Sequence, residues 1–320
     1  MAELLVIGDA TVDQMYFIDR LPEAGGEASA THAVMEPGGA GGTMATALAR
    51  LGHDVAIATR VGTGPFSALA LKHVRGSGVD LGLVQSDPHL QTSSVTILIT
   101  PDGQRTMIGA AGASRDLDAR ALRPEHVVRR DAMVMSAYSL ISGPQRTYAL
   151  RALRLAKEAG VRVFIDMGTG AVNALQDGLM PLLEGAEVVL MNERELFTLT
   201  GESSISDAVS GLRSHGIEQV VVKVGEMGSI VVTPARSELV EALEIDGVVD
   251  TTGAGDVYTA AFVASLLEGH DLLEAAWLAN VAGALTTREI GAQRVVIDHA
   301  LLARHAHEDT EAARPVAGQR

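Results

Sequence analysis

The sequence predicts an α/β protein with a doubly wound, mostly parallel sheet flanked by helices and a small antiparallel sheet beside it. Short runs rich in Val, Ile, Leu and Met alternate along the chain with longer Ala- and Leu-rich stretches. This alternation is typical of parallel strands that are joined by covering helices. Two other segments, at about 12–36 and 92–110, alternate apolar and polar residues, which indicates half-exposed antiparallel strands.

Six apolar runs are the predicted strands of the main sheet, and they are expected to be buried on both faces. They are Leu4–Ile7, Asp54–Thr59, Ala132–Met135, Val161–Ile165, Val188–Met191 and Gln219–Val224. The predicted helices are Gly42–Leu51, Arg146–Ala159, Val257–Leu267 and a segment from Asp271 to about 287. Three of these helices are followed by a glycine, which is common just after the C-terminus of a helix. Asp271 and Glu274 have the spacing of a capping box at the start of the fourth.

The two alternating segments are the predicted strands of a small subsidiary sheet, and Pro101-Asp-Gly103 is a strong hairpin turn between two of them. A sheet this small must pack on a ligand, on the main domain or on a partner chain. Because its free edge and face need cover, we expect a homodimer formed through this sheet. Residues 1–303 are expected to form one domain, and the polar segment 304–320 is expected to be a flexible tail.

The composition excludes several classes of protein. The chain of 320 residues has no cysteine and carries 40 acidic against 25 basic side chains, a net charge of −15. Disulfide scaffolds, thiolate metal sites and cysteine nucleophiles are therefore excluded, and a nucleic-acid partner is disfavoured. No apolar stretch approaches the ~18 residues of a membrane span, and we expect no signal peptide at the start. We expect a soluble, cytoplasmic protein without a membrane partner.

The sharpest motif is Asp250-Thr-Thr-Gly-Ala-Gly-Asp256, which runs directly into an apolar helix. Small residues let backbone N–H groups approach a ligand, and the helix N-terminus adds its dipole, so the segment is typical of an anion site. A carboxylate there makes sense if Asp256 takes a proton from a hydroxyl that attacks a phosphoryl group. The alternative is that Asp256 only caps the helix.

A second glycine-rich segment, Pro37-Gly-Gly-Ala-Gly-Gly42, also precedes a predicted helix. Its glycines allow close approach to a hydroxyl-rich molecule or to an anion, and the alternative is a flexible turn. Asp13 lies where the first strand passes into the first alternating segment. Its carboxylate suits paired hydroxyls, although a surface position is the default interpretation for one such residue.

Two further motifs follow predicted strands. Asn192 and Glu195 have a spacing that suits a hydrated Mg²⁺ beside phosphates, and the alternative is an ordinary charged helix start. Lys223 is followed by Gly225 and Gly228, which suggest a turn near a nucleotide with the lysine reaching a phosphate. The alternative is a hairpin turn with a solvated lysine.

Several catalytic motifs are missing. No Gly-Lys dipeptide occurs, so there is no P-loop, and no GxGxxG occurs, which disfavours an NAD-dependent oxidoreductase. There is also no GxSxG or HExxH motif, and none of the ten histidines is assigned to catalysis.

Taken in this order, the segments resemble the ribokinase-like (PfkB) family of carbohydrate kinases over residues 3–302. The Asp250–Asp256 segment is similar to the family's C-terminal motif, and Gly38-Gly39 with the following helix to the N-terminal glycine motif. Asn192–Glu195 resembles the family's NxxE, and Ala279-Asn280 and Gly291-Ala292 resemble its closing helix and a late turn near the adenine. The resemblance implies a ribokinase-like fold in which the segments at about 12–36 and 92–110 form a lid over the sugar, often serving as a dimer clasp. It also implies ATP-dependent phosphorylation of a hydroxymethyl group on a sugar or sugar derivative.

The resemblance also implies roles for the matched positions. Asp256 is implied as the catalytic base, and the N–H groups of Gly253, Ala254, Gly255 and Asp256 as the anion hole. Lys223, Gly225, Gly228, Asn280 and Asn192 are implied on the ATP side, with Glu195 holding Mg²⁺ through water. Asp13, Gly38, Gly39, Thr11 and Thr43 are implied at the acceptor. Asp250, Thr252 and Gly291 lie where many members bind a monovalent cation, usually K⁺.

The chain departs from the family pattern at the acceptor. The family usually carries Asn at the positions of Thr43 and Thr11, and Thr offers one hydroxyl where Asn offers a carbonyl and an amide. Ribose is therefore disfavoured as the acceptor. Asp166, Gly168 and Tyr138 follow strand ends and are expected to touch it. The alternatives are a nucleoside kinase of the adenosine type on the same scaffold, or a sugar-binding regulator without catalysis.

Overall fold

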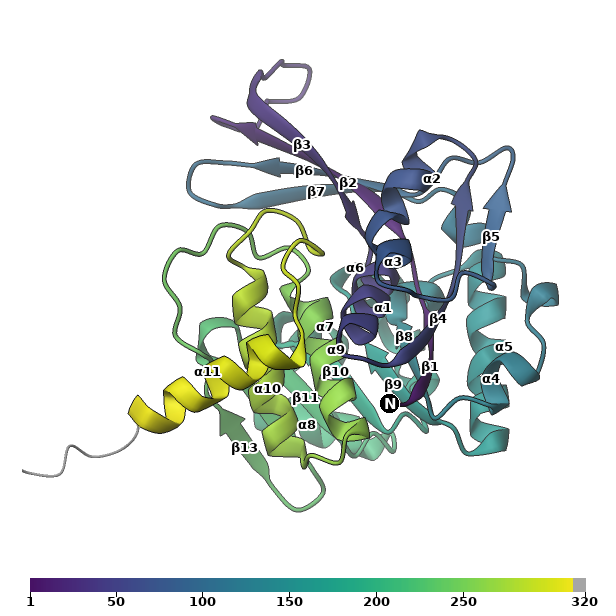
Figure 1. The fold of residues 1–320 in the computed structure, drawn as a ribbon, viewed down its shortest axis with the longest axis vertical. Coiled ribbons are helices and arrows are strands. Elements are labelled where there is room, and N and C mark those ends of the chain that lie inside the picture. The colour runs from purple at the N-terminus through teal and green to yellow at the C-terminus, as the bar shows by residue number, and fades with distance from the viewer. Residues whose placement is uncertain (313–320) are drawn as a thin grey trace, which may run out of the picture.

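The structure, a computed structural model, describes residues 1–312, without the side chains of Asp177 and 306–312. Within this part of the chain, a nine-stranded sheet has the order β13-β12-β11-β10-β9-β8-β1-β4-β5 (Figure 1). The strands are β1 Glu3–Ile7, β4 Asp54–Gly62, β5 Val84–Asp87, β8 Ala132–Ser136, β9 Arg162–Asp166, β10 Val188–Asn192, β11 Val220–Lys223, β12 Ser229–Val232 and β13 Ser237–Val240. The strands from β11 to β5 pair in parallel, while β12 and β13 add an antiparallel edge. The predicted mostly parallel sheet is confirmed.

Helices cover both faces of this sheet (Figure 1). They are α1 Ala40–Arg50, α2 Pro65–Ala70, α3 Lys72–Gly76, α4 Glu125–Val128, α5 Gly143–Ala159, α6 Thr169–Leu175, α7 Glu193–Thr200, α8 Ile205–Ser214, α9 Ala254–Leu267, α10 Leu272–Thr286 and α11 His299–Ala312. Alternate residues of β1 point into two separate cores. Leu4 and Val6 pack with α1, α9 and α10, whereas Leu5 and Ile7 pack with α5 and α7.

The helix that follows the Asp250–Asp256 motif lies in the middle of the first core. Nine residues of α9 are buried, mostly Ala and Val, and α9 packs closely along α10. A helix that is apolar all round is stable only when other elements surround it. This position holds the start of α9 at the carboxyl ends of the strands.

A second sheet has the order β3-β2-β6-β7 and lies over the carboxyl ends of the main strands, at the top of Figure 1. Its strands are β2 Thr11–Ile18, β3 Ala30–Gly38, β6 Ser94–Ile99 and β7 Arg105–Ala110. We call it the lid. β2 pairs antiparallel with β3, and β6 with β7, as predicted, but β2 and β6 pair in parallel. The alternating pattern predicts strands and their exposed face, but it does not specify which neighbour each strand takes.

The C-terminal segment begins with a helix. The helix α11 continues to Ala312, where a flexible tail was expected from residue 304. The Asp298 carboxylate accepts a hydrogen bond from the Leu301 N–H at the start of α11, and Leu302 is buried in the first core. The remainder of the predicted tail, 313–320, lies outside the described residues.

No helix within residues 1–312 is both long enough and apolar enough to cross a membrane.

Candidate active site

Three adjacent strands end in the polar residues of the site. Asp166 ends β9, Asn192 ends β10 and Lys223 ends β11, and Asn192 lies directly beside Lys223 in the sheet register. In open α/β sheets ligands bind outside the carboxyl ends of strands. The structure therefore brings these residues together beneath the lid.

Lys223 forms an ion pair with Asp166. Its Nζ lies 2.8 Å from Asp166 Oδ1, and it also approaches the carbonyl of Gly255 and the hydroxyl of Thr259, each at 3.4 Å. Burial alone would lower the pKa of Lys223, but the carboxylates of Asp166 and Glu195 outweigh it and raise that pKa. The solvated lysine considered in the sequence analysis is excluded, although the turn is indeed a hairpin, between β11 and β12.

Asp256 lies in the first turn of α9 and does not cap it. The N-cap is Gly253, whose φ of 76° suits glycine and whose Cβ would lie 2.2 Å from Ala292. No side-chain cap bond forms, and no hydrogen bond from the described residues reaches the half-buried Asp256 carboxylate. Burial, together with the charge of Asp166, raises the pKa of Asp256 to about 8, although Lys223 opposes the shift.

Asn192 and Glu195 form a reciprocal capping box at the start of α7. The Glu195 N–H donates to Asn192 Oδ1 at 2.8 Å, and the Asn192 N–H donates to Glu195 Oε2 at 3.0 Å. The Thr169 hydroxyl donates to the other Glu195 oxygen at 3.0 Å. Burial raises the pKa of Glu195 despite the nearby Lys223 charge. Asn192 and Glu195 therefore do form a helix start, which was the alternative interpretation. The same hydrogen bonds orient Glu195 toward the site.

The N-terminal glycines are required by contacts rather than by flexibility. A Cβ on Gly38 would lie 2.2 Å from the Asp13 carboxylate, and one on Gly39, where φ is 86°, would lie 2.5 Å from the carbonyl of Asp9. Asp13 is buried rather than at the surface. Burial raises the pKa of Asp13 to about 6, although the hydrogen bond from Thr11 opposes the shift. The flexible-turn alternative does not hold for this segment.

The two threonines that depart from the family pattern are both buried and already bonded. The Thr11 hydroxyl donates to Asp13 Oδ1 at 2.9 Å. Thr43, only 1% exposed, accepts from the buried Gln293 amide at 3.3 Å. These hydroxyls orient Asp13 and Gln293 in this structure.

A cavity of about 970 Å³ adjoins Lys223 and the start of α9. Lys223, Gly225, Gly228, Gly255 and Asn280 are among its lining residues. Its size and mixed apolar and polar lining suit a ligand as large as a nucleotide. The Asn280 side chain does not point its amide into this space, because Nδ2 donates to the carbonyls of Val240 at 2.9 Å and Glu241 at 3.0 Å. Asn280 instead holds the wall of the cavity.

The predicted monovalent-cation position is occupied by hydrogen-bond donors. Asp250 Oδ1 accepts from the Thr252 N–H at 2.9 Å and from its hydroxyl at 2.6 Å, and Oδ2 accepts from the Gly291 N–H at 2.9 Å. Arg105, the first residue of β7, places Nη1 at 2.9 Å from Thr252 Oγ1 and 3.7 Å from Asp250 Oδ1. A guanidinium therefore already faces the oxygens at which the cation was predicted.

Tyr138, which was expected to touch the acceptor, lies against two glycines. A Cβ on Gly168 would lie 2.3 Å from the Tyr138 ring, and one on Gly170 would lie 2.7 Å from it. The ring is 37% exposed. Burial raises the pKa of Tyr138, and the charges of Glu195 and Asp256 add to the shift. Tyr138 is therefore part of the same cluster as the acids.

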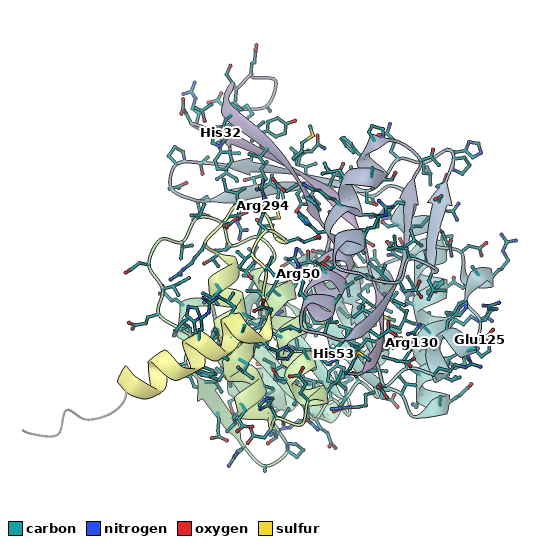
Figure 2. The ribbon with its side chains drawn as sticks, viewed as in Figure 1. His32, Arg50, His53, Glu125, Arg130 and Arg294 are labelled. Atoms are coloured by element: carbon teal, nitrogen blue, oxygen red, sulfur yellow. The ribbon has the colours of Figure 1, made fainter. Side chains whose placement is uncertain are left out.

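Sequence reasoning missed the arginines that tie the segment 293–295 to the lid and to α1. Arg294 forms an ion pair with Glu36 of β3, and Arg50 donates to the carbonyls of Gln293 at 2.8 Å and Val295 at 3.0 Å. Figure 2 shows Arg294 below the lid strands and Arg50 beneath it. These partners lie more than 240 positions apart, so no local pattern indicates them.

Solved structures with this architecture define the class of protein. The structure of Arabidopsis thaliana ribokinase complexed with ribose and ATP matches with a TM-score of 0.82 at 27% identity, over 95% of this chain and 98% of that one. Among sequences, an ATP-dependent ribose-1-phosphate kinase of Halopiger xanaduensis is 34% identical over 92% of this chain and 94% of its own length. A ribokinase of Arabidopsis thaliana is 30% identical over 90% and 77%. The class is that of the ribokinase-like kinases, as the fold predicted.

The family follows from the match along the chain. Residues 1–299 match the family described as pfkB family carbohydrate kinase. The chain belongs to this family and is a carbohydrate kinase, as the sequence motifs predicted.

Proposed function

We propose that this kinase transfers the γ-phosphoryl group of ATP to a hydroxymethyl group of a sugar or sugar derivative, with Asp256 as the general base. The observation that carries the proposal is the Asp256 carboxylate, which faces the site without a hydrogen bond from the described residues. A pKa near 8 suits a base that works near neutral pH, because such a group binds and releases a proton readily.

In the proposed reaction, Asp256 accepts the proton of the acceptor hydroxyl while the hydroxyl oxygen attacks the γ-phosphorus. The bond to the bridging oxygen breaks, and ADP leaves. Negative charge on the transferred group is held by the N–H groups at the start of α9, which have no partners within the helix. The Ala254 N–H makes only a long bond, 3.4 Å, to the carbonyl of Thr251, so the turn remains available to an anion.

ATP fits the cavity beside Lys223, with the phosphates directed to the start of α9. Support comes from the lining by Gly225 and Gly228 and from the ATP bound in the plant ribokinase structure. Lys223 then exchanges part of its contact with Asp166 for a phosphate. The β-hairpin turn at residues 225–228 lets the nucleotide approach the backbone.

Mg²⁺ suits the donors beside this cavity. Asp166, Glu195 and Asp256 are close enough for their charges to act on one another, and one ammonium, Lys223, faces all three. Carboxylate oxygens are the ligands that Mg²⁺ prefers, often through water. Glu195, oriented by Asn192 and Thr169, would hold the ion. When bound, Mg²⁺ neutralises phosphate charge.

The acceptor is proposed to lie under the lid against Asp13 and the backbone of Gly38 and Gly39. The free oxygen of Asp13 suits paired hydroxyls, because Thr11 occupies only one of its two oxygens. Tyr138 is 37% exposed and lies close enough to Asp256 for that charge to act on it. The named relatives phosphorylate ribose 1-phosphate or ribose by their names, so both belong among the acceptors to be tested.

The lid is also proposed to form a homodimer. Its edge strands β3 and β7 are mostly exposed, and Met35, Met107 and Ile108 are 49–59% exposed on them. An exposed edge with apolar side chains is covered in most proteins by another element or chain. Sedimentation at micromolar concentration should show a dimer, and a monomer there would contradict the proposal.

The experiment that tests the proposed function is a coupled assay of ADP release with MgATP and a panel of acceptors. The panel holds ribose, ribose 1-phosphate, fructose, fructose phosphates, ketodeoxygluconate, tagatose, inositol and adenosine. Acceptor-dependent ADP release with a sugar, and a phosphate ester on its hydroxymethyl group by ³¹P NMR, would support the proposal. A response to adenosine alone would overturn the sugar assignment and leave the base in place.

A further inference from the structure

We propose that the guanidinium of Arg105 takes the place of the monovalent cation that the family resemblance predicts, so that this kinase works without K⁺. The inference concerns a positioning residue and rests on the proposed function only for its effect on the rate. Its structural part can be tested without any acceptor.

The first argument is the geometry around Asp250. The Asp250 side chain is 4% exposed, and its two oxygens accept hydrogen bonds from the backbone N–H groups of Thr252 and Gly291. Hydrogen bonds from neutral groups leave its charge uncompensated, and an uncompensated buried charge is costly. Arg105, with its Nη1 3.7 Å from Asp250, is the cation that faces it among the described residues.

The second argument is the location of the contact. Arg105 Nη1 donates to the Thr252 hydroxyl at 2.9 Å, and the same hydroxyl donates to Asp250. Thr252 immediately precedes Gly253, the N-cap of α9. The guanidinium therefore acts on the loop that leads into the proposed anion hole, one residue from its start.

The third argument is that the two cations exclude each other. A guanidinium bound to Thr252 and close to Asp250 repels a second positive charge at the same oxygens. Arg105 is half-buried, with 28% of its side chain exposed, so solvent screens this repulsion only in part.

The fourth argument is the origin of Arg105 in the lid. It is the first residue of β7, directly after the hairpin turn at 100–104, whereas Asp250 and Thr252 belong to the main domain. A free ion would be independent of the lid, whereas the guanidinium of Arg105 belongs to a lid strand. The arrangement thus joins the position of the lid to the geometry of the loop that begins α9.

The test uses the full chain, an Arg105→Ala variant and an Arg120→Ala control. Arg120 pairs with Asp118 in an exposed turn, so the control removes a comparable arginine–aspartate pair far from the site. Thermal unfolding is measured for all three in potassium chloride and in tetramethylammonium chloride of equal ionic strength. Initial rates are then compared in the same two salts with an acceptor found in the panel.

We expect wild type and Arg120→Ala to respond equally to the two salts in both measurements. The melting temperature of Arg105→Ala should be higher in potassium chloride than in tetramethylammonium chloride, unlike those of the other two proteins. Its rate should be about 10- to 100-fold below wild type in tetramethylammonium and should recover about tenfold in K⁺.

Two results would overturn the proposal. One is a wild-type enzyme that K⁺ activates about tenfold. The other is an Arg105→Ala protein whose melting temperature does not respond to K⁺. The melting data keep the test separate from the proposed function, since they are obtained even if no acceptor is found.

Discussion

The ammonium of Lys223 lies 2.8 Å from the carboxylate of Asp166, with both side chains largely withdrawn from solvent. The Thr259 hydroxyl donates to the same Asp166 oxygen at 2.5 Å, so the pair is fixed between β9, β11 and α9. This contact holds the start of α9 over the ends of the strands, and it keeps the lysine beside the nucleotide cavity.

Lys223→Met should destabilise the protein strongly, because it leaves the Asp166 carboxylate buried without its partner. We expect a loss of about 3–5 kcal/mol in the free energy of unfolding. The double variant Lys223→Met/Asp166→Asn should recover part of it, since the carboxylate in direct contact with Lys223 is then removed with it. Urea unfolding of the four proteins measures the coupling. Additive losses would contradict the pairing described above.

Gly38→Ala should weaken acceptor binding more than ATP binding. The new Cβ would lie 2.2 Å from the Asp13 carboxylate, so that side chain must move. A displacement of about 1 Å at a binding group can cost about 10²-fold in rate, and we expect kcat/KM for the acceptor to fall to that extent. Gly109→Ala in β7 is the control, because its Cβ meets open space. An equal increase in KM for ATP and for the acceptor would count against an acceptor role for Asp13.

Asp13→Asn should make the protein more stable at neutral pH and less active. The pKa of Asp13 is raised from 3.8 to about 6, so stability is lost as the pH rises from about 4 to about 6 and stays low above that. Removing that charge should add about 1–3 kcal/mol to the free energy of unfolding above pH 6. The gain should vanish near pH 4, where wild-type Asp13 is protonated in the folded state. A gain that is independent of pH would show that burial of this charge is not its cause.

The pH dependence of kcat/KM should reflect Asp256. A general base must be ionised to accept a proton, and the pKa of this group is raised to about 8. kcat/KM for the acceptor should therefore rise with pH and level off above about pH 8. Steady-state rates between about pH 6 and pH 9.5 measure the profile. A profile that is flat across this range would mean that no group with a raised pKa acts as the base.

Much of the main domain could be predicted because its signals are local. The strand β1 and the helices α5, α9 and α10 begin and end within about three residues of their predicted bounds, since apolar runs and terminal glycines mark them. The Asp250–Asp256 segment was recognisable for the same reason, since seven adjacent residues form both the loop and the start of α9.

The contacts that assemble the site could not be predicted, because they join distant positions. Lys223 and Asp166 are 57 positions apart, Arg105 and Thr252 are 147 apart, and the Gln293–Thr43 bond spans 250. Residue type alone gives several plausible partners for each charge. The choice depends on strand order and on the position of the lid, which only the folded chain defines.

The most direct test of the account is the turnover of Asp256→Asn with an acceptor that the wild-type enzyme phosphorylates. Asn keeps the shape of the side chain but cannot accept the proton. We predict a fall in kcat of about 10²–10⁴, with ATP binding unchanged by calorimetry. Glu158→Gln on the exposed face of α5 is the control and should match wild type. Turnover of Asp256→Asn close to that of wild type would contradict the central claim that this carboxylate is the catalytic base.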